Sequence, residues 1–76
     1  MSGSKVEPIY LRLAAKIVDG RKWFGITQEE LAKRCGISRP SLANIEAGRQ
    51  RVSLHDVEAL AKAMGTEPEI LMKGIW

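Results

Sequence analysis

Residues 27–48, which read TQEELAKRCGISRPSLANIEAG, constrain the fold of this chain more than any other segment. Thr27 can cap the start of one short helix, Gly36 can end it, and Ser38 can cap the start of a second. Two short helices joined by a tight glycine turn form a helix-turn-helix, and its second helix has the size to enter a DNA major groove. The segment therefore predicts a DNA-binding unit at the centre of the chain.

The apolar residues of this segment favour a close helix pair. Ala32, four residues before Gly36, is small enough to let two helices cross closely. Ile37 can fill the corner of the turn, while Leu42 and Ile45 can hold the second helix against the first. Two antiparallel helices of an unrelated bundle are the alternative, but they would not require residues of these sizes at these offsets.

The rest of the chain continues the helical pattern, and no stretch alternates as a strand would. We predict three further helices, over about 8–22, 54–64 and 67–71. Each of the last two follows a Ser or Thr with an acidic residue three positions later, as Thr27 is followed by Glu30, which is the pattern of a capping box. The fold class is therefore all-α: a compact bundle of about five helices with a helix-turn-helix at its centre.

Three details of these helices are further expectations. Gly20 should interrupt the first helix. The two later capping boxes should pair Ser53 with Asp56 and Thr66 with Glu69. The fourth helix should bury one apolar stripe, made of Leu54, Val57, Leu60, Ala61 and Met64.

With 76 residues the chain forms one small domain over 1–76, in which we expect 1–6 to be flexible. A domain of this size buries roughly 60% of the surface of its unfolded chain, so its stability margin is thin. Cys35 is the single cysteine and His55 the single histidine, which excludes an internal disulfide and makes a metal site unexpected. We expect no cofactor, and stability must come from efficient helix packing, a homodimer or both.

Charge is distributed unevenly along the chain. The first 51 residues carry ten Lys and Arg against five Asp and Glu, and the last 25 carry two against four. A basic half that contains the helix pair suits a polyanionic partner, although many proteins of similar charge bind no nucleic acid. No apolar run reaches the ~18 residues of a membrane span and no secretory leader is visible, so we expect a cytoplasmic, nucleoid-associated protein without a membrane partner.

From Arg21 to about Leu71 the sequence resembles the lambda-repressor-like helix-turn-helix family, which includes phage repressors, Cro proteins and restriction–modification controllers. The matching positions are Arg21, 25–28 (GITQ), 30–32 (ELA), 36–38 (GIS), 45–48 (IEAG) and 53–54 (SL). The resemblance implies a five-helix domain whose third helix enters the major groove of double-stranded DNA, usually as a homodimer. We expect no small-molecule ligand, because the chain has no room for a ligand-sensing domain beside these helices.

The resemblance also suggests base-reading residues. Arg39, at the start of the third helix, is the first candidate, because a guanidinium can bind both acceptors of a guanine; a phosphate contact or simple solvation are its alternatives. Asn44 suits adenine or an internal hydrogen bond. Pro40 departs from the polar residues often found there and can touch a thymine methyl group. Ser38 is small enough to approach a base, but it can equally be a helix cap alone.

Four residues are candidates for contacts to the DNA backbone. The resemblance gives Gln28 a phosphate contact at a helix N-terminus, where free amides attract anions; it can also brace Arg39 or lie free on the surface. Ser41 is small enough to approach a phosphate. Arg49 and Arg51 follow the third helix and fit an electrostatic clamp on the backbone, with an ordinary solvated loop as the alternative.

Two structural roles complete these expectations. In the family, the positions of Arg21 and Glu46 form a partly buried ion pair that joins the first helix to the third. The apolar C-terminus predicts a dimer interface made of Ile70, Leu71, Ile75 and Trp76. For Ile70 and Leu71 the core of the chain itself is the alternative. Trp23 and Phe24 depart from the family, and we expect one to cover an edge of the core and the other to be exposed.

A sequence-specific transcriptional regulator, of the repressor or controller type, is the function these residues favour. A protein-interaction module of the same fold, such as the antitoxin of a toxin–antitoxin pair, is the alternative. An enzyme is disfavoured, because the sequence offers no nucleophile–base pair, no paired carboxylates in an apolar setting and no phosphate-binding glycine loop.

Overall fold

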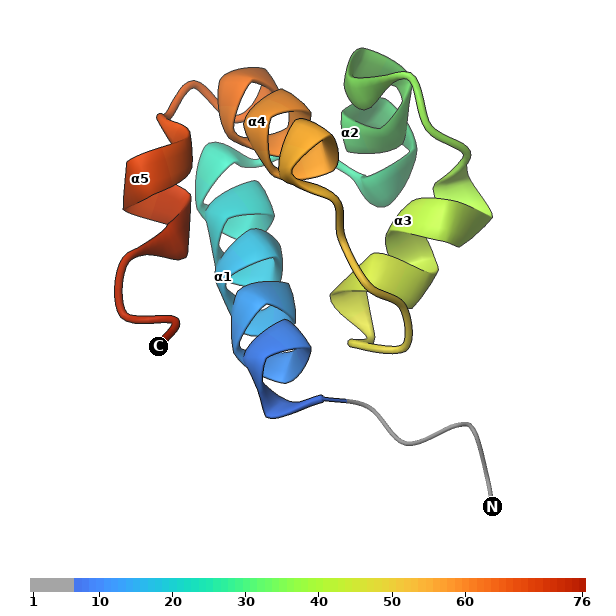
Figure 1. The fold of residues 1–76 in the computed structure, drawn as a ribbon. Helices are drawn as coiled ribbons and strands as arrows, with labels where there is room; N and C mark the ends of the chain where they lie inside the picture. Colours follow the sequence, from blue (N-terminus) through green and yellow to red (C-terminus); the bar gives the residue numbers. More distant parts are fainter. Residues whose placement is uncertain (1–6) are drawn as a thin grey trace.

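The computed structural model describes residues 7–76 and folds them into five α-helices without any strand (Figure 1). The helices are α1 (Pro8–Phe24), α2 (Gln28–Cys35), α3 (Arg39–Glu46), α4 (Leu54–Ala63) and α5 (Pro68–Met72). The all-α prediction and the number of helices are confirmed. The expectation for 1–6 lies outside the described residues.

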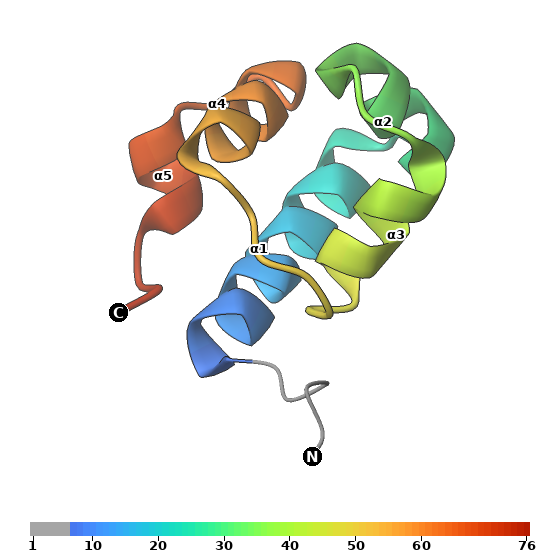
Figure 2. The ribbon, with the colours of Figure 1, turned by 45° about the vertical axis from the view of Figure 1, so that its right-hand side comes forward.

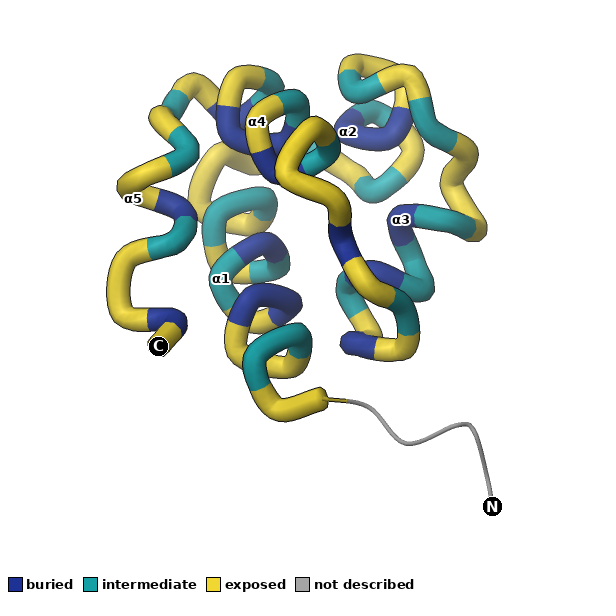
Figure 3. Tube along the Cα trace, viewed as in Figure 1, coloured by how far each residue is buried: buried dark blue, intermediate teal, exposed yellow. Residues whose placement is uncertain are grey.

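The long helix α1 runs through the middle of the domain, between α3 on one side and α5 on the other (Figures 1 and 2). α2 packs against α3 and α4, and α4 also packs against α5. Apolar side chains from all five helices and the C-terminus meet in one core (Figure 3). The largest of those that are less than 2% exposed are Ile17, Leu31, Leu42, Ile45, Leu60 and Ile75.

The turn between α2 and α3 forms as the sequence predicts. Gly36 takes the left-handed conformation with φ 74°, and the N–H of Ile37 donates to the carbonyl of Ala32 at 3.0 Å. This closure buries Ala32 and turns the chain sharply. Ser38 then caps α3, because its Oγ accepts a hydrogen bond from the N–H of Ser41 at 3.1 Å.

Gly20 does not interrupt α1, contrary to the prediction, since the helix continues to Phe24. The reason is a close approach between helices. A Cβ at Gly20 would lie 3.2 Å from Sδ of Met64, so the glycine makes room for a buried side chain at the end of α4. The residue is a packing feature of this helix and not its end.

Two capping boxes and one stripe position also differ from the prediction. Thr27 caps α2 through the N–H of Glu30, but the Glu30 carboxylate accepts from Arg34 instead of returning to the cap. Thr66 does not cap α5, which begins after Glu67 without a side-chain cap. The N–H of Thr66 instead donates to the carbonyl of Ala61 at the end of α4. Leu54 is 79% exposed, because the first residue of α4 projects beyond the core.

Ser53 caps α4 as predicted, but within residues 7–76 its N–H forms no return bond with the Asp56 carboxylate, so only half of the capping box is present. The N–H of Asp56 donates to Ser53 Oγ at 3.0 Å, which starts α4. Trp23 is 90% exposed, whereas Phe24 is partly covered, with the guanidinium of Arg34 lying 5.6 Å from the centre of its ring. Trp23 therefore remains in solvent as expected, whereas Phe24 lies against Arg34 and not against the core, so the expected cover of a core edge does not form.

Candidate nucleic-acid interface

Helix α3 divides into a buried side and an exposed side. Leu42 and Ile45 are at most 1% exposed and hold the helix on the core. Arg39 and Pro40 at the start of the helix and Ala47 at its C-cap are exposed, on the opposite side. The side of α3 that could contact another molecule is therefore the exposed side, which begins with Arg39.

Arg39 is the first residue of α3, and within residues 7–76 it forms no hydrogen bond or ion pair. Its planar guanidinium carries five N–H donors on a long stem. A side chain of this type, exposed at the start of a helix, is available for the two acceptors of a guanine edge or for a phosphate.

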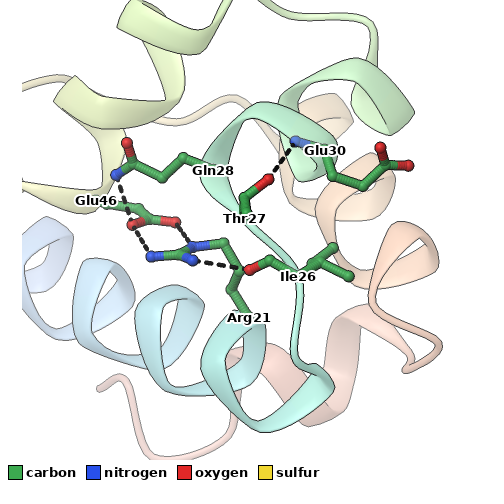
Figure 4. A network of polar contacts seen from close by, with 6 residues as sticks. All are labelled: Arg21, Ile26, Thr27, Gln28, Glu30 and Glu46. Carbon is green, nitrogen blue, oxygen red and sulfur yellow. Dashed lines mark hydrogen bonds and ion pairs between the residues drawn. The ribbon is translucent and has the colours of Figure 1, made fainter.

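Glu46 is the centre of a polar network at the inner flank of α3 (Figure 4). Arg21 reaches it from α1 with two parallel contacts, Nε to Oε2 at 2.7 Å and Nη2 to Oε1 at 3.1 Å. The side chains are 14% exposed for Arg21 and 5% exposed for Glu46. Such a bidentate pair fixes the relative orientation of the two groups, so α1 and α3 are joined at a defined angle.

Two further contacts complete this network. Arg21 Nη1 donates to the carbonyl of Ile26 at 2.9 Å, which attaches the segment before α2. Gln28 Nε2 donates to Glu46 Oε1 at 2.9 Å (Figure 4). Gln28 therefore braces Glu46 and not Arg39, and its amide points along the inner flank of α3.

The outer flank of α3 is held by the loop that follows the helix. Gly48 has φ 74° and reverses the chain, so that the N–H of Arg49 donates to the carbonyl of Asn44 at 2.9 Å. Arg49 Nη1 also donates to Asn44 Oδ1 at 3.2 Å. The next residue, Gln50, donates from Nε2 to Ser41 Oγ at 3.3 Å.

Gln50 and the loop contacts are a feature that the sequence analysis missed. The signal for them is the glycine in IEAG, because a left-handed residue directly after a helix returns the next side chains toward its last turns. Arg51, the other predicted clamp residue, points elsewhere: its Nε lies 2.9 Å from Oε1 of Glu7, in front of α1, and both side chains are largely exposed.

The four apolar residues of the C-terminus separate into two pairs. Leu71 and Ile75 are 4% and 1% exposed and belong to the core of the single chain, so their assignment to a dimer interface is wrong. The carbonyl of Ile75 also accepts a hydrogen bond from Arg12 Nε, which ties the C-terminus to α1. Ile70 and Trp76 are 57% and 85% exposed and remain available for an interface.

Cys35 carries a free thiol that packs, partly buried, against the core. Burial raises the pKa of the Cys35 thiol, and the negative charge of Asp56 raises it further, which favours the protonated thiol over the nucleophilic thiolate. Within residues 7–76 no three His, Cys, Asp or Glu side chains are grouped to hold a metal ion. None of the helices in this range has the length and apolarity needed to cross a membrane.

A five-helix domain with a tight glycine turn between α2 and α3, and with an exposed arginine at the start of α3, defines a helix-turn-helix protein. The family model for the helix-turn-helix matches residues 17–71. The chain belongs to this family, and the lambda-repressor-like fold that the sequence resembles is confirmed.

Known proteins of similar sequence and structure agree with this membership. An uncharacterized HTH-type transcriptional regulator of Methanothermobacter thermautotrophicus is 43% identical over 51 residues, which is 67% of this chain and 74% of that protein. The restriction–modification controller protein C.AhdI of Aeromonas hydrophila is 31% identical, with a TM-score of 0.79 over 82% of this chain and 94% of the controller.

The DNA-binding domain of the P22 c2 repressor is also similar. It is 25% identical, with a TM-score of 0.78 over 96% of this chain and 88% of the repressor domain. The protein is accordingly a DNA-binding transcription regulator of the helix-turn-helix type.

Proposed function

We propose that this regulator binds a specific double-stranded DNA operator with α3 in the major groove, as a homodimer on a roughly palindromic site. The observation that carries the proposal is the position of Arg39, which is exposed at the N-terminal end of α3 while the opposite side of that helix fills the core. In helix-turn-helix proteins the N-terminal residues of the second helix contact base edges. The function is binding, without catalysis, and its place is the cytoplasm.

The proposed base contacts come from the exposed side of α3. Arg39 binds the O6 and N7 acceptors of a guanine, Pro40 lies against a thymine methyl group, and Asn44 meets a base further along the groove. Ser38 and Ser41 have their oxygens engaged by a cap contact and by Gln50, so their roles are to shape this surface and to approach the backbone.

The proposed backbone contacts lie on both sides of these readers. Gln28 is the first residue of α2, where the free amides of a helix N-terminus favour a phosphate. Arg49 supplies positive charge at the end of α3, and Arg51 does the same when it leaves its exposed contact with Glu7. These contacts set the register of the protein on the duplex without reading its sequence.

A homodimer is supported by the two apolar side chains that the single chain leaves exposed near its C-terminus, Ile70 and Trp76. Trp23 and Ile70 line one groove of about 490 Å³ between α1 and α5, which extends this apolar surface. In a two-fold dimer the half-sites on the DNA would lie one helical turn apart, about 34 Å. Light scattering at micromolar concentration tests this part: a monomer contradicts it.

The DNA proposal is tested by selecting bound fragments from a random duplex pool and measuring their affinities. Arg39→Ala should relax the preference at one position per half-site, with discrimination there falling by roughly 5- to 150-fold, the equivalent of ~1–3 kcal/mol. An equal loss of affinity for selected and random duplexes would contradict the assignment. No complex with any duplex at low salt would favour a protein-interaction module of the same fold, such as an antitoxin.

A further inference from the structure

The end of α3 places one polar side chain directly beside another. Gly48, three residues after Ile45, reverses the chain. Its N–H donates to the carbonyl of Ile45 at 3.0 Å, and the N–H of Arg49 donates to the carbonyl of Asn44 at 2.9 Å. These two hydrogen bonds form the Schellman closure of a helix C-terminus. The closure brings the residue after the glycine next to the third-last residue of the helix, here Arg49 next to Asn44.

The same closure at the end of α2 shows what is unusual here. There the corresponding pair is Ala32 and Ile37, two apolar residues, and the former is buried. An apolar contact is the ordinary companion of this closure. In α3 the pair is polar and faces solvent, with Arg49 Nη1 donating to Asn44 Oδ1 at 3.2 Å.

The direction of this hydrogen bond follows from the chemistry of the two groups. Arginine has N–H donors and no acceptor, so the amide atom that faces Arg49 must be the oxygen of Asn44. The Nδ2 group, with its two hydrogens, is then the part of the amide that has no partner among residues 7–76. A side chain fixed in this way approaches a base as a donor.

The purine edges in the major groove differ in how many acceptors they offer to such a donor. Guanine presents two acceptors, N7 and O6, whereas adenine presents one acceptor beside one donor. Binding both groups of an adenine requires the amide oxygen of Asn44 to face the base together with its NH2 group. The hydrogen bond from Arg49 uses one of the two lone pairs of that oxygen and holds it toward the loop after α3. Guanine requires donors alone.

We propose that Arg49 is a positioning residue that holds the amide of Asn44 as a donor, so that Asn44 selects guanine over adenine. The proposal rests on the proposed function, because it assumes that α3 lies in the major groove. Arg49 has further N–H groups beyond the one that it donates to Asn44, and these remain free for a phosphate. The same arginine would thus orient the base-reading amide of Asn44 and contact the DNA backbone, so the base contact depends on where the protein sits along the duplex.

The experiment compares base preferences of four proteins by selection from a random duplex pool: the unmodified chain, Asn44→Ala, Arg49→Ala and Arg51→Ala. Asn44→Ala identifies the position that this side chain reads. Arg51→Ala is the matched control. It removes the same charge two residues away, from a side chain that contacts Glu7 instead of α3.

The expected result is a guanine preference at the Asn44 position in the unmodified chain and a shift toward adenine in Arg49→Ala, by roughly tenfold in the ratio of the two affinities. Arg51→Ala should weaken binding to all sequences without changing that ratio. A uniform loss of affinity in Arg49→Ala, with the ratio unchanged, overturns the positioning role.

The remaining outcomes separate this inference from the proposed function. If Asn44→Ala changes the base preference at no position, while Arg39→Ala still relaxes the preference at the position that Arg39 reads, the inference fails and the proposed function stands. If the unmodified chain forms no complex with duplex DNA, both fail. Circular dichroism of each variant excludes unfolding as the cause of a loss.

Discussion

The inner and outer flanks of α3 use the same kinds of side chain for opposite purposes. On the inner flank Glu46, 5% exposed, accepts from Arg21 and Gln28 and joins α3 to α1 and α2. On the outer flank Asn44 accepts from Arg49 at a surface that faces solvent. Because a polar contact gains strength as water is excluded, the inner contacts should determine stability and the outer contacts should determine which DNA is bound.

The largest expected effect is the loss of either partner of the inner ion pair. Arg21→Ala leaves the Glu46 carboxylate buried without its cation, and we expect a loss of ~3–5 kcal/mol in the free energy of unfolding, measured by urea denaturation. Glu46→Ala should lose a similar amount. A double variant that replaces both residues should lose less than the sum of the two single variants, since neither charge is then left alone.

Thermal unfolding of Arg21→Ala and Glu46→Ala provides a result that could contradict this prediction. Melting curves of both single variants that overlay the unmodified protein would mean that the pair does not join α1 to α3, and the distinction between the two flanks would disappear.

Much of the fold around α3, but not all of it, could be predicted from the sequence. Five helices and the turn at Gly36 follow from local signals, namely capping residues and helical spacing, whereas the contact between Arg21 and Glu46 follows from the resemblance to the family. The continuation of α1 through Gly20 could not be predicted, because it depends on Met64 from a distant helix. Propensity describes a residue alone, whereas packing is decided by its neighbours.

The same limit applies to the candidate site. The sequence identified Asn44 and Arg49 as separate contact residues and did not predict that one holds the other, because their bond depends on the left-handed turn at Gly48. It also placed Leu71 and Ile75 at a dimer interface, although both lie in the core. Whether an apolar residue near a chain end is covered by its own chain depends on the path of that end.

A second, smaller effect tests the turn that supports the outer flank. Gly48→Ala forces an L-residue to φ 74° and sets its Cβ 2.6 Å from Cδ2 of Leu11. The backbone strain alone costs about 1–3 kcal/mol, and the displacement of Leu11 adds to it. Gly36→Ala is the control, with the same φ of 74° and no atom within 4 Å of its Cβ.

Urea denaturation of the two glycine variants measures the difference. Gly48→Ala should be the less stable by the cost of moving Leu11, because the strain from φ is common to both. Equal losses would show that Leu11 yields freely, and the outer flank would then rest on its hydrogen bonds alone.

The smallest effect on stability is expected from the exposed pair in front of α1. Arg51 and Glu7 are 78% and 52% exposed in their side chains, although their 2.9 Å contact is nearly as short as that of Arg21 with Glu46. Water screens the exposed pair, so Arg51→Ala should lower the free energy of unfolding by less than ~0.5 kcal/mol. If Arg51 contacts phosphate as proposed, the same variant should reduce the slope of log affinity against log salt by about one. A stability loss comparable with that of Arg21→Ala would show that contact length, and not burial, sets the strength of these ion pairs, and the assignment of stability to the inner flank would lose its basis.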